Sequence, residues 1–182
     1  MIYQPAEDTY LIARTLARFV RGRSVLDMGA GSGFLIEAAL NAGASSAMAA
    51  DINPEVIEIL RLKRLSAVQS DLFENISGCF DVIVCNPPYL PDDTRENPES
   101  KVALAGGKHG DEVTLRFLKQ APRHLTQGGI ILLLLSSLTP KSRIIPLLKR
   151  QRLSHEVIAT HKLFMERLEV WKITRSEQVR DK

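Results

Sequence analysis

The chain has 182 residues, of which 45% are hydrophobic and 25% charged, and its formal net charge is +3. This balance predicts one globular domain over residues 1–182 with a full hydrophobic core, and it argues against a disordered chain. The longest apolar run, at 130–135, is too short to cross a bilayer, and two cysteines make neither a disulfide framework nor a zinc site. We therefore expect a cytoplasmic protein without a metal or a membrane partner.

Helical and strand patterns alternate along the chain. The first half predicts helices at 7–20, 34–42 and 54–62, and strands at 23–28, 45–51, 65–71 and 79–85. The second half predicts helices at 111–125 and 140–151, a strand at 130–137, and two antiparallel final strands at 154–162 and 166–174. This alternation predicts an α/β fold with a mainly parallel sheet and a ligand crevice at the carboxyl ends of the strands.

A glycine-rich turn, "VLDMGAGSGF", follows the first predicted strand. Gly29, Gly31 and Gly33 are spaced G-x-G-x-G, unlike the dinucleotide-binding G-x-G-x-x-G, and they allow the backbone to approach a ligand closely. Asp27 precedes the turn, where a carboxylate would repel a pyrophosphate but would suit a cation. S-adenosylmethionine carries an ammonium and a sulfonium and no phosphate, so the turn favours this cofactor.

Two further acidic residues end the next two predicted strands. Asp51 can accept hydrogen bonds from both ribose hydroxyls, and Ile52 beside it is assigned to the same site. Asp71 is placed to accept from the adenine amino group, with Leu72 offering a backbone donor and an apolar contact. Each acid alone could cap a helix or a turn, and for Asp71 alone that interpretation is favoured. The three acids beside a glycine turn together predict a cofactor site.

This set of motifs resembles that of the class I methyltransferases. The resemblance covers essentially the whole chain, and it implies a Rossmann-like, seven-stranded sheet with a reversed last strand and helices on both faces. It also implies that the segment after the fourth strand faces the transferred methyl group.

That segment reads "NPPY", which resembles the signature of methyltransferases that act on a planar nitrogen. Pro87 and Pro88 stiffen the loop because they fix two φ angles and remove two backbone donors. The Asn86 side-chain carbonyl and the Pro87 backbone carbonyl can both accept from one NH2 group, and Asn86 also borders the cofactor. Tyr89 can stack on the planar target.

Two longer stretches resemble the archaeal and eukaryotic release-factor glutamine methyltransferases, which are relatives of HemK. They are "YQPAEDTYLI", in which Thr9 is expected to lie against the cofactor, and "LAGGKHGDEVTLRFL". The resemblance implies N5-methylation of the glutamine in the Gly-Gly-Gln motif of a class I release factor. It also implies a heterodimer with a small zinc-binding activator that docks beside the third strand, where Leu62, Leu65 and Val68 are contact candidates, although they also read as core residues.

The "NPPY" loop alone leaves other acceptors open. A protein lysine is one alternative, and the N6 amine of adenine in DNA or RNA is another, because an exocyclic amine is also planar. A nucleic-acid enzyme must capture a flipped base and hold phosphates, yet the sequence has no concentrated basic stripe with interleaved aromatic residues. We therefore expect a protein substrate and no direct nucleic-acid binding.

Overall fold

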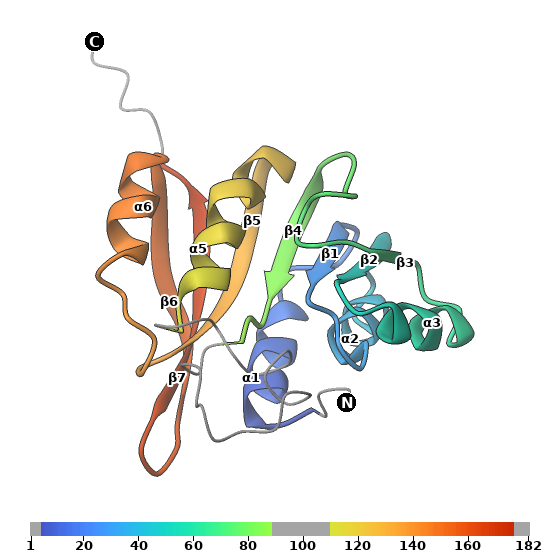
Figure 1. Ribbon diagram of the computed structural model, residues 1–182, viewed down its shortest axis with the longest axis horizontal. Helices are drawn as coiled ribbons and strands as arrows, with labels where there is room; N and C mark the ends of the chain where they lie inside the picture. Colours follow the sequence, from blue (N-terminus) through green and yellow to red (C-terminus); the bar gives the residue numbers. More distant parts are fainter. Residues whose placement is uncertain (1–4, 89–109, 177–182) are drawn as a thin grey trace.

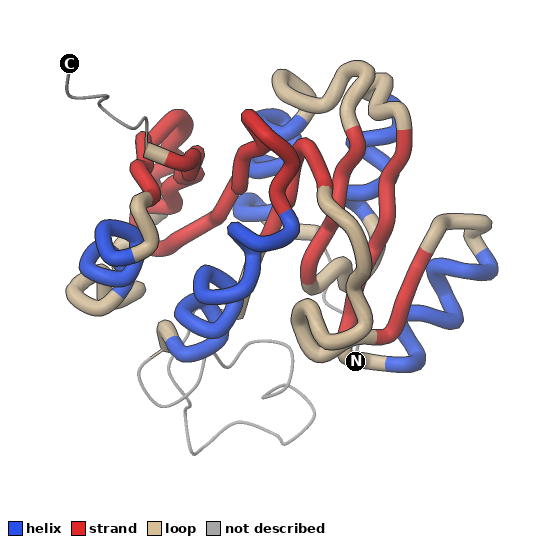
Figure 2. Tube along the Cα trace, turned by 90° about the horizontal axis from the view of Figure 1, so that it is seen from above, coloured by secondary structure: helices blue, strands red, loops and turns tan. Residues whose placement is uncertain are grey.

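The structure is a computed structural model that describes residues 5–88 and 110–176. These residues form a seven-stranded sheet in the order β3-β2-β1-β4-β5-β7-β6, with helices on both faces (Figures 1 and 2). The strands are β1 (Ser24–Met28), β2 (Ser46–Asp51), β3 (Ala67–Gln69), β4 (Phe80–Cys85), β5 (Leu125–Ser136), β6 (Leu153–Lys162) and β7 (Arg167–Arg175). The helices are α1 (Glu7–Leu16), α2 (Phe34–Asn41), α3 (Pro54–Leu62), α5 (Glu112–Gln120) and α6 (Ile144–Arg150), with a short 3-10 helix, η1 (Ala121–His124).

The topology confirms the predicted fold class. Strands β1 to β5 pair in parallel, whereas β7 runs antiparallel to both of its neighbours, β5 and β6. The chain order of the strands reverses between β1 and β4, because β2 and β3 extend the sheet on one side of β1 and β4 continues it on the other. In open α/β sheets a ligand crevice lies at such a reversal, beyond the carboxyl ends of the strands.

Two large apolar cores and a smaller one between α2, β2 and α3 fill the space between the sheet and its helices. One large core contains side chains of α5 and α6, and the other large core contains side chains of α1 and α2. Strand residues alternate between these cores: Val82 and Val84 of β4 face α1 and α2, while Ile83 and Cys85 face the opposite layer. The same alternation directs Asn86, the residue after β4, toward α1.

Several predicted elements have different bounds in the structure. The first helix ends at Leu16 rather than at residue 20, because the chain tightens into i→i−3 hydrogen bonds and then turns at Gly22, whose φ is +69°. The helix predicted at 111–125 ends at Gln120 and continues as η1, where Pro122 has no backbone donor to extend the α-helix.

Other segments differ in length. β5 begins five residues earlier than predicted, and its pairing with β4 is irregular near Phe80, where Gly128 adopts a φ of +76°. β3 is only three residues long, and α6 begins at Ile144 rather than at residue 140. Cys85 is buried, whereas Cys79 is exposed. None of the helices in the described ranges is both long and apolar enough to span a membrane.

Candidate active site

The glycine turn after β1 is fastened to β2 by Asp51. One carboxylate oxygen of Asp51 accepts from the backbone N–H of Gly31 at 3.0 Å, and the other accepts from that of Asn53 at 2.9 Å. Gly29 and Gly33 have φ angles of +77° and +83°, which L-residues rarely adopt. Asp51 therefore holds the turn in shape, and each of its oxygens keeps a further lone pair for a ligand.

Asp27 is a buried acid at the same edge of the sheet. Its side chain is 1% exposed, and among the described residues no donor forms a hydrogen bond to either carboxylate oxygen. Burial, together with the negative charge of Asp51, raises the pKa of Asp27 to about 7, although the nearby backbone N–H of Ile36 opposes the shift. A buried carboxylate without a hydrogen-bond donor is suited to pair with a cation.

The residues predicted to hold the adenine end lie at the neighbouring strand ends. Asp71 follows β3 and forms an ion pair with Arg116 of α5 at 2.8 Å, so one of its oxygens already has a partner. Leu72 follows with a φ of +51°, and its side chain packs against the core beneath α5. The Ile52 side chain, at the end of β2, is 54% exposed. The three acids thus lie at the carboxyl ends of adjacent strands, in the arrangement expected from the sequence.

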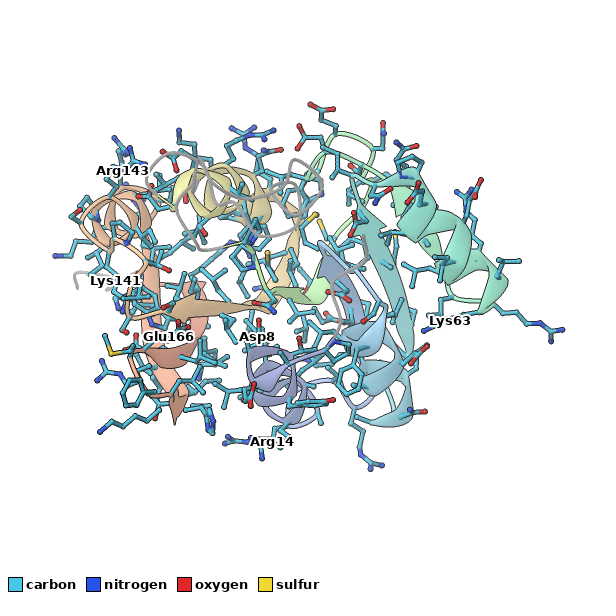
Figure 3. The ribbon with its side chains drawn as sticks, turned by 60° about the horizontal axis from the view of Figure 1, so that its bottom comes forward. Asp8, Arg14, Lys63, Lys141, Arg143 and Glu166 are labelled. Carbon is cyan, nitrogen blue, oxygen red and sulfur yellow. The ribbon has the colours of Figure 1, made fainter. Side chains whose placement is uncertain are left out.

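Asn86 sits directly after β4, at the centre of this edge. Its side-chain Nδ2 donates to Oδ2 of Asp8 in α1 at 2.9 Å, and Figure 3 shows Asp8 on the side of α1 that faces the sheet, opposite Arg14. Its Oδ1 is buried and has no hydrogen-bond partner within the part of the chain that the structure describes. Pro87 is buried and Pro88 is half-buried, whereas Tyr89 lies outside the described residues.

Asp8 is the site residue that the sequence reasoning did not identify. Its position in the first turn of a helix is explained equally well by the helix dipole, so the sequence offers no distinct signal for a second role. Thr9, which was predicted to lie against the cofactor, is buried beside it and bonds to Asp8 through both its backbone N–H and its hydroxyl. Thr9 therefore lies beside the residue that bonds to Asn86, and its contact with the cofactor stays a prediction.

The residues at this edge fit S-adenosylmethionine. A buried, unpaired carboxylate at Asp27 suits the positive charges of that cofactor, and Asp51 offers acceptors for hydroxyl groups. Apart from its chain neighbours, no described residue has an atom within 4 Å of the place that a Cβ on Gly29 would occupy, so the turn leaves space there for a ligand.

Comparison with known proteins places this site in a family. The methyltransferase small domain model matches residues 7–165. A candidate protein N5-glutamine methyltransferase of Methanocaldococcus jannaschii is 38% identical over 177 residues, which cover 93% of this chain and 89% of that protein. Methyltransferase HEMK2 of Mus musculus is 28% identical over 193 residues, covering 96% of this chain and 90% of that protein.

A solved structure gives the same result. The E. cuniculi Mtq2–Trm112 complex, responsible for the methylation of the eRF1 translation termination factor, superposes with a TM-score of 0.78 at 27% identity, covering 96% of this chain and 99% of that chain. The chain therefore belongs to the methyltransferase small domain family and, within it, to the HemK-related group of class I methyltransferases.

Proposed function

We propose that this protein transfers a methyl group from S-adenosylmethionine to the side-chain N5 of a glutamine, and that this glutamine belongs to the Gly-Gly-Gln motif of a class I release factor. The cofactor would supply a methyl group bonded to a positively charged sulfur. Asp27 would bind its cationic groups and Asp51 its hydroxyl groups. The buried Thr9, the exposed Ile52 and the glycine turn would also contact it. Asp71 and Leu72 would bind its adenine end.

The observation that carries the proposal is the buried Oδ1 of Asn86, which has no partner among the described residues. An unsatisfied buried acceptor is costly unless a ligand supplies the donor. Oδ1 is suited to accept a hydrogen bond from one N–H of the nitrogen that receives the methyl group. The Pro87 carbonyl would accept a hydrogen bond from the second N–H of the same nitrogen. These two bonds would turn the nitrogen toward the methyl group and stabilise the positive charge that develops on it during transfer.

The amide nitrogen of glutamine is a weak nucleophile because its lone pair is delocalised into the carbonyl. In the transfer the nitrogen would form an N–C bond to the methyl group that the cofactor supplies, the sulfur would keep the electron pair of the broken S–C bond, and the nitrogen would release one proton to solvent. Two acceptors that hold the N–H groups favour this change, and Tyr89 would stack on the planar amide. Glutamine as the methyl acceptor is supported by the names of the relatives, which include a candidate protein N5-glutamine methyltransferase and the complex responsible for eRF1 methylation.

The edge strand β3 is the proposed docking place for a small zinc-binding activator, as part of a heterodimer. Among the described strands β3 pairs with β2 alone, and an unpaired edge can accept a strand from another protein. Leu62 beside it is 83% exposed, so its interpretation as a core residue was wrong, whereas Leu65 and Val68 are half-buried. The complex of Mtq2 with Trm112 supports a partner of this kind. We place the heterodimer in the cytoplasm, where release factors act.

The proposal is tested by offering several acceptors to one preparation of the enzyme. The chain is co-expressed with a candidate zinc-binding activator and supplied with S-adenosylmethionine that carries a labelled methyl group. Purified release factor, the same factor with Gly-Gly-Gln changed to Gly-Gly-Ala, a lysine-rich tail peptide and duplex DNA are assayed in parallel. The label is expected only in the unmodified release factor, and mass spectrometry is expected to place it on the glutamine.

Each other outcome contradicts a defined part of the proposal. Label in DNA without label in the release factor identifies an adenine methyltransferase. Label in the lysine-rich peptide alone identifies a lysine methyltransferase. Equal label in the Gly-Gly-Ala factor shows that the motif glutamine is not the acceptor.

A further inference from the structure

The contact between Asp8 and Asn86 joins the first helix to the segment after β4, across 78 positions of the sequence. Asp8 is held firmly, because its Oδ1 accepts from the backbone N–H of Thr9 at 2.6 Å and from the Thr9 hydroxyl at 3.2 Å. Its side chain is only 4% exposed. The other oxygen, Oδ2, accepts a hydrogen bond from Nδ2 of Asn86.

A carboxylate accepts hydrogen bonds and cannot donate them, whereas a primary amide donates at one end and accepts at the other. The end of the Asn86 amide that faces Asp8 must therefore be the nitrogen. The oxygen is then forced to the opposite side, and that oxygen is the buried Oδ1 without a partner among the described residues. The orientation of the amide follows from the chemistry of the two groups.

We propose that Asp8 is a positioning residue that selects the orientation of the Asn86 amide, and that through this orientation it sets the enzyme's discrimination between an amide and a carboxylate acceptor. This inference rests on the proposed function, because it concerns the group that Asn86 faces. With Nδ2 hydrogen-bonded to Asp8, Oδ1 faces the methyl-accepting group of the substrate. Oδ1 then binds the NH2 group of a glutamine and repels a carboxylate oxygen of a glutamate. In the reverse orientation Nδ2 would meet the acceptor, which would favour the carboxylate of a glutamate.

In this proposal Asp8 acts through Asn86, to which it is hydrogen-bonded, and touches neither the methyl-accepting group nor the transferred methyl group. Replacing Asp8 with Asn preserves the size of the side chain and still permits a hydrogen bond to Asn86. The new amide can accept from Nδ2 or donate to Oδ1, so it no longer dictates which end of Asn86 turns outward. Asp8→Asn thus changes the selection of the orientation while the contact itself is retained.

The test compares Asp8→Asn with Glu7→Gln in the activator-bound enzyme. Glu7 is the preceding residue, is exposed, and loses the same charge in the same helical turn. The first readout is the nitrogen-15 side-chain amide resonance of Asn86, assigned by its disappearance in Asn86→Ser. We expect this resonance to shift in Asp8→Asn and to stay in place in Glu7→Gln, because Asp8 is hydrogen-bonded to that amide and Glu7, in the described part of the chain, is not.

The second readout is binding of two peptides, one with Gly-Gly-Gln and one with Gly-Gly-Glu. The wild-type enzyme is expected to prefer the glutamine peptide strongly. In Asp8→Asn the ratio of the two dissociation constants is expected to fall about tenfold, and kcat is expected to fall about tenfold, with the affinity for S-adenosylmethionine unchanged. Glu7→Gln is expected to match the wild type in each measurement.

The outcomes distinguish this inference from the proposed function. An unshifted Asn86 resonance in Asp8→Asn overturns the inference whatever the substrate proves to be. An unchanged peptide ratio in Asp8→Asn also overturns it, because a merely structural contact would leave the ratio alone. A wild-type enzyme that binds neither peptide contradicts the proposed function and with it the claim about discrimination, whereas the resonance still decides whether Asp8 orients Asn86.

Discussion

Asp27 and Asp51 lie near the carboxyl ends of the neighbouring strands β1 and β2, and their negative charges oppose each other. Burial of Asp27 is the larger cause and the charge of Asp51 the smaller one, and together they raise the pKa of Asp27 to about 7. Asp51 differs because its two oxygens accept backbone N–H groups. One acid of the pair is therefore easily protonated near neutral pH, and a bound cation would reverse that shift.

The affinity for S-adenosylmethionine is predicted to depend on pH through Asp27. A cationic ligand favours the ionised carboxylate, so binding below about pH 7 must release the proton that Asp27 carries. The dissociation constant is expected to rise up to about tenfold per pH unit as the pH falls below 7. Calorimetric titrations from pH 5 to pH 8 measure this slope. Asp27→Asn is the control, because it keeps only the slope that comes from the ligand and from other groups.

The stability of the ligand-free protein is predicted to fall as the pH rises through the range in which Asp27 ionises. An acid that is ion-paired in the folded state would have the opposite effect. Asp27 has a pKa of about 7 when folded and about 3.8 when exposed, so between these values the folded state binds more protons than the unfolded state. The free energy of unfolding therefore falls as the pH rises from 4 to 7, by up to about 4 kcal/mol. Urea unfolding of the wild type and of Asp27→Asn at each pH isolates this contribution, and equal slopes would contradict it.

The glycine turn is predicted to tolerate no side chain at Gly33. An added Cβ there would lie 2.4 Å from Cδ2 of Leu60, which is fully buried in the core between α2 and α3. The positive φ costs about 1–2 kcal/mol for an L-residue, and overpacking adds about 1–3 kcal/mol. Gly22→Ala is the matched control, because Gly22 also has a positive φ but no atom within 4 Å of the added Cβ. Similar losses of stability in Gly33→Ala and Gly22→Ala would show that the contact with Leu60 is unimportant.

Docking of the activator at β3 is predicted to depend on Leu62. Because this side chain is 83% exposed, Leu62→Gln is expected to leave the melting temperature of the isolated chain unchanged. It is expected to weaken binding of the activator at least about tenfold, measured by calorimetry or by co-purification. Phe164→Gln serves as the control, because Phe164 is 97% exposed beyond β6, at the opposite edge of the sheet. Equal loss of binding in both variants would move the interface away from β3.

The topology and the edge that carries the site could be predicted from the sequence. Buried parallel strands appear in the sequence as continuous apolar runs. An acidic residue at the end of such a run marks the carboxyl edge of the sheet, because a charged side chain does not contribute to the packing of the apolar core. The bounds of β5 were harder to predict, since Gly128 and Gly129 read as a turn although the strand passes through them. The exposure of Leu62 was missed because an apolar helix residue reads as core unless the neighbouring strand is known to be an edge.

The partner of Asn86 could not be predicted from the sequence. Asp8 and Asn86 are 78 positions apart, and no local pattern encodes their contact. The contact arises because strand alternation turns Asn86 toward the face that α1 covers, and because α1 begins just before Asp8. Both conditions depend on how a helix lies against the sheet, which is a tertiary property. Similarly, the ion pair of Asp71 with Arg116 depends on the packing of α5 beside the end of β3.

In the proposed function, the role of Asn86 is to act on the methyl-accepting nitrogen and not on the cofactor. It is tested most directly by measuring methyl transfer and cofactor affinity on the same sample of Asn86→Ala, with its melting temperature as a check of folding. We predict that kcat falls by at least about a thousandfold while the dissociation constant of S-adenosylmethionine stays within about threefold of the wild type. A folded variant whose cofactor affinity falls as steeply as its activity would contradict the account.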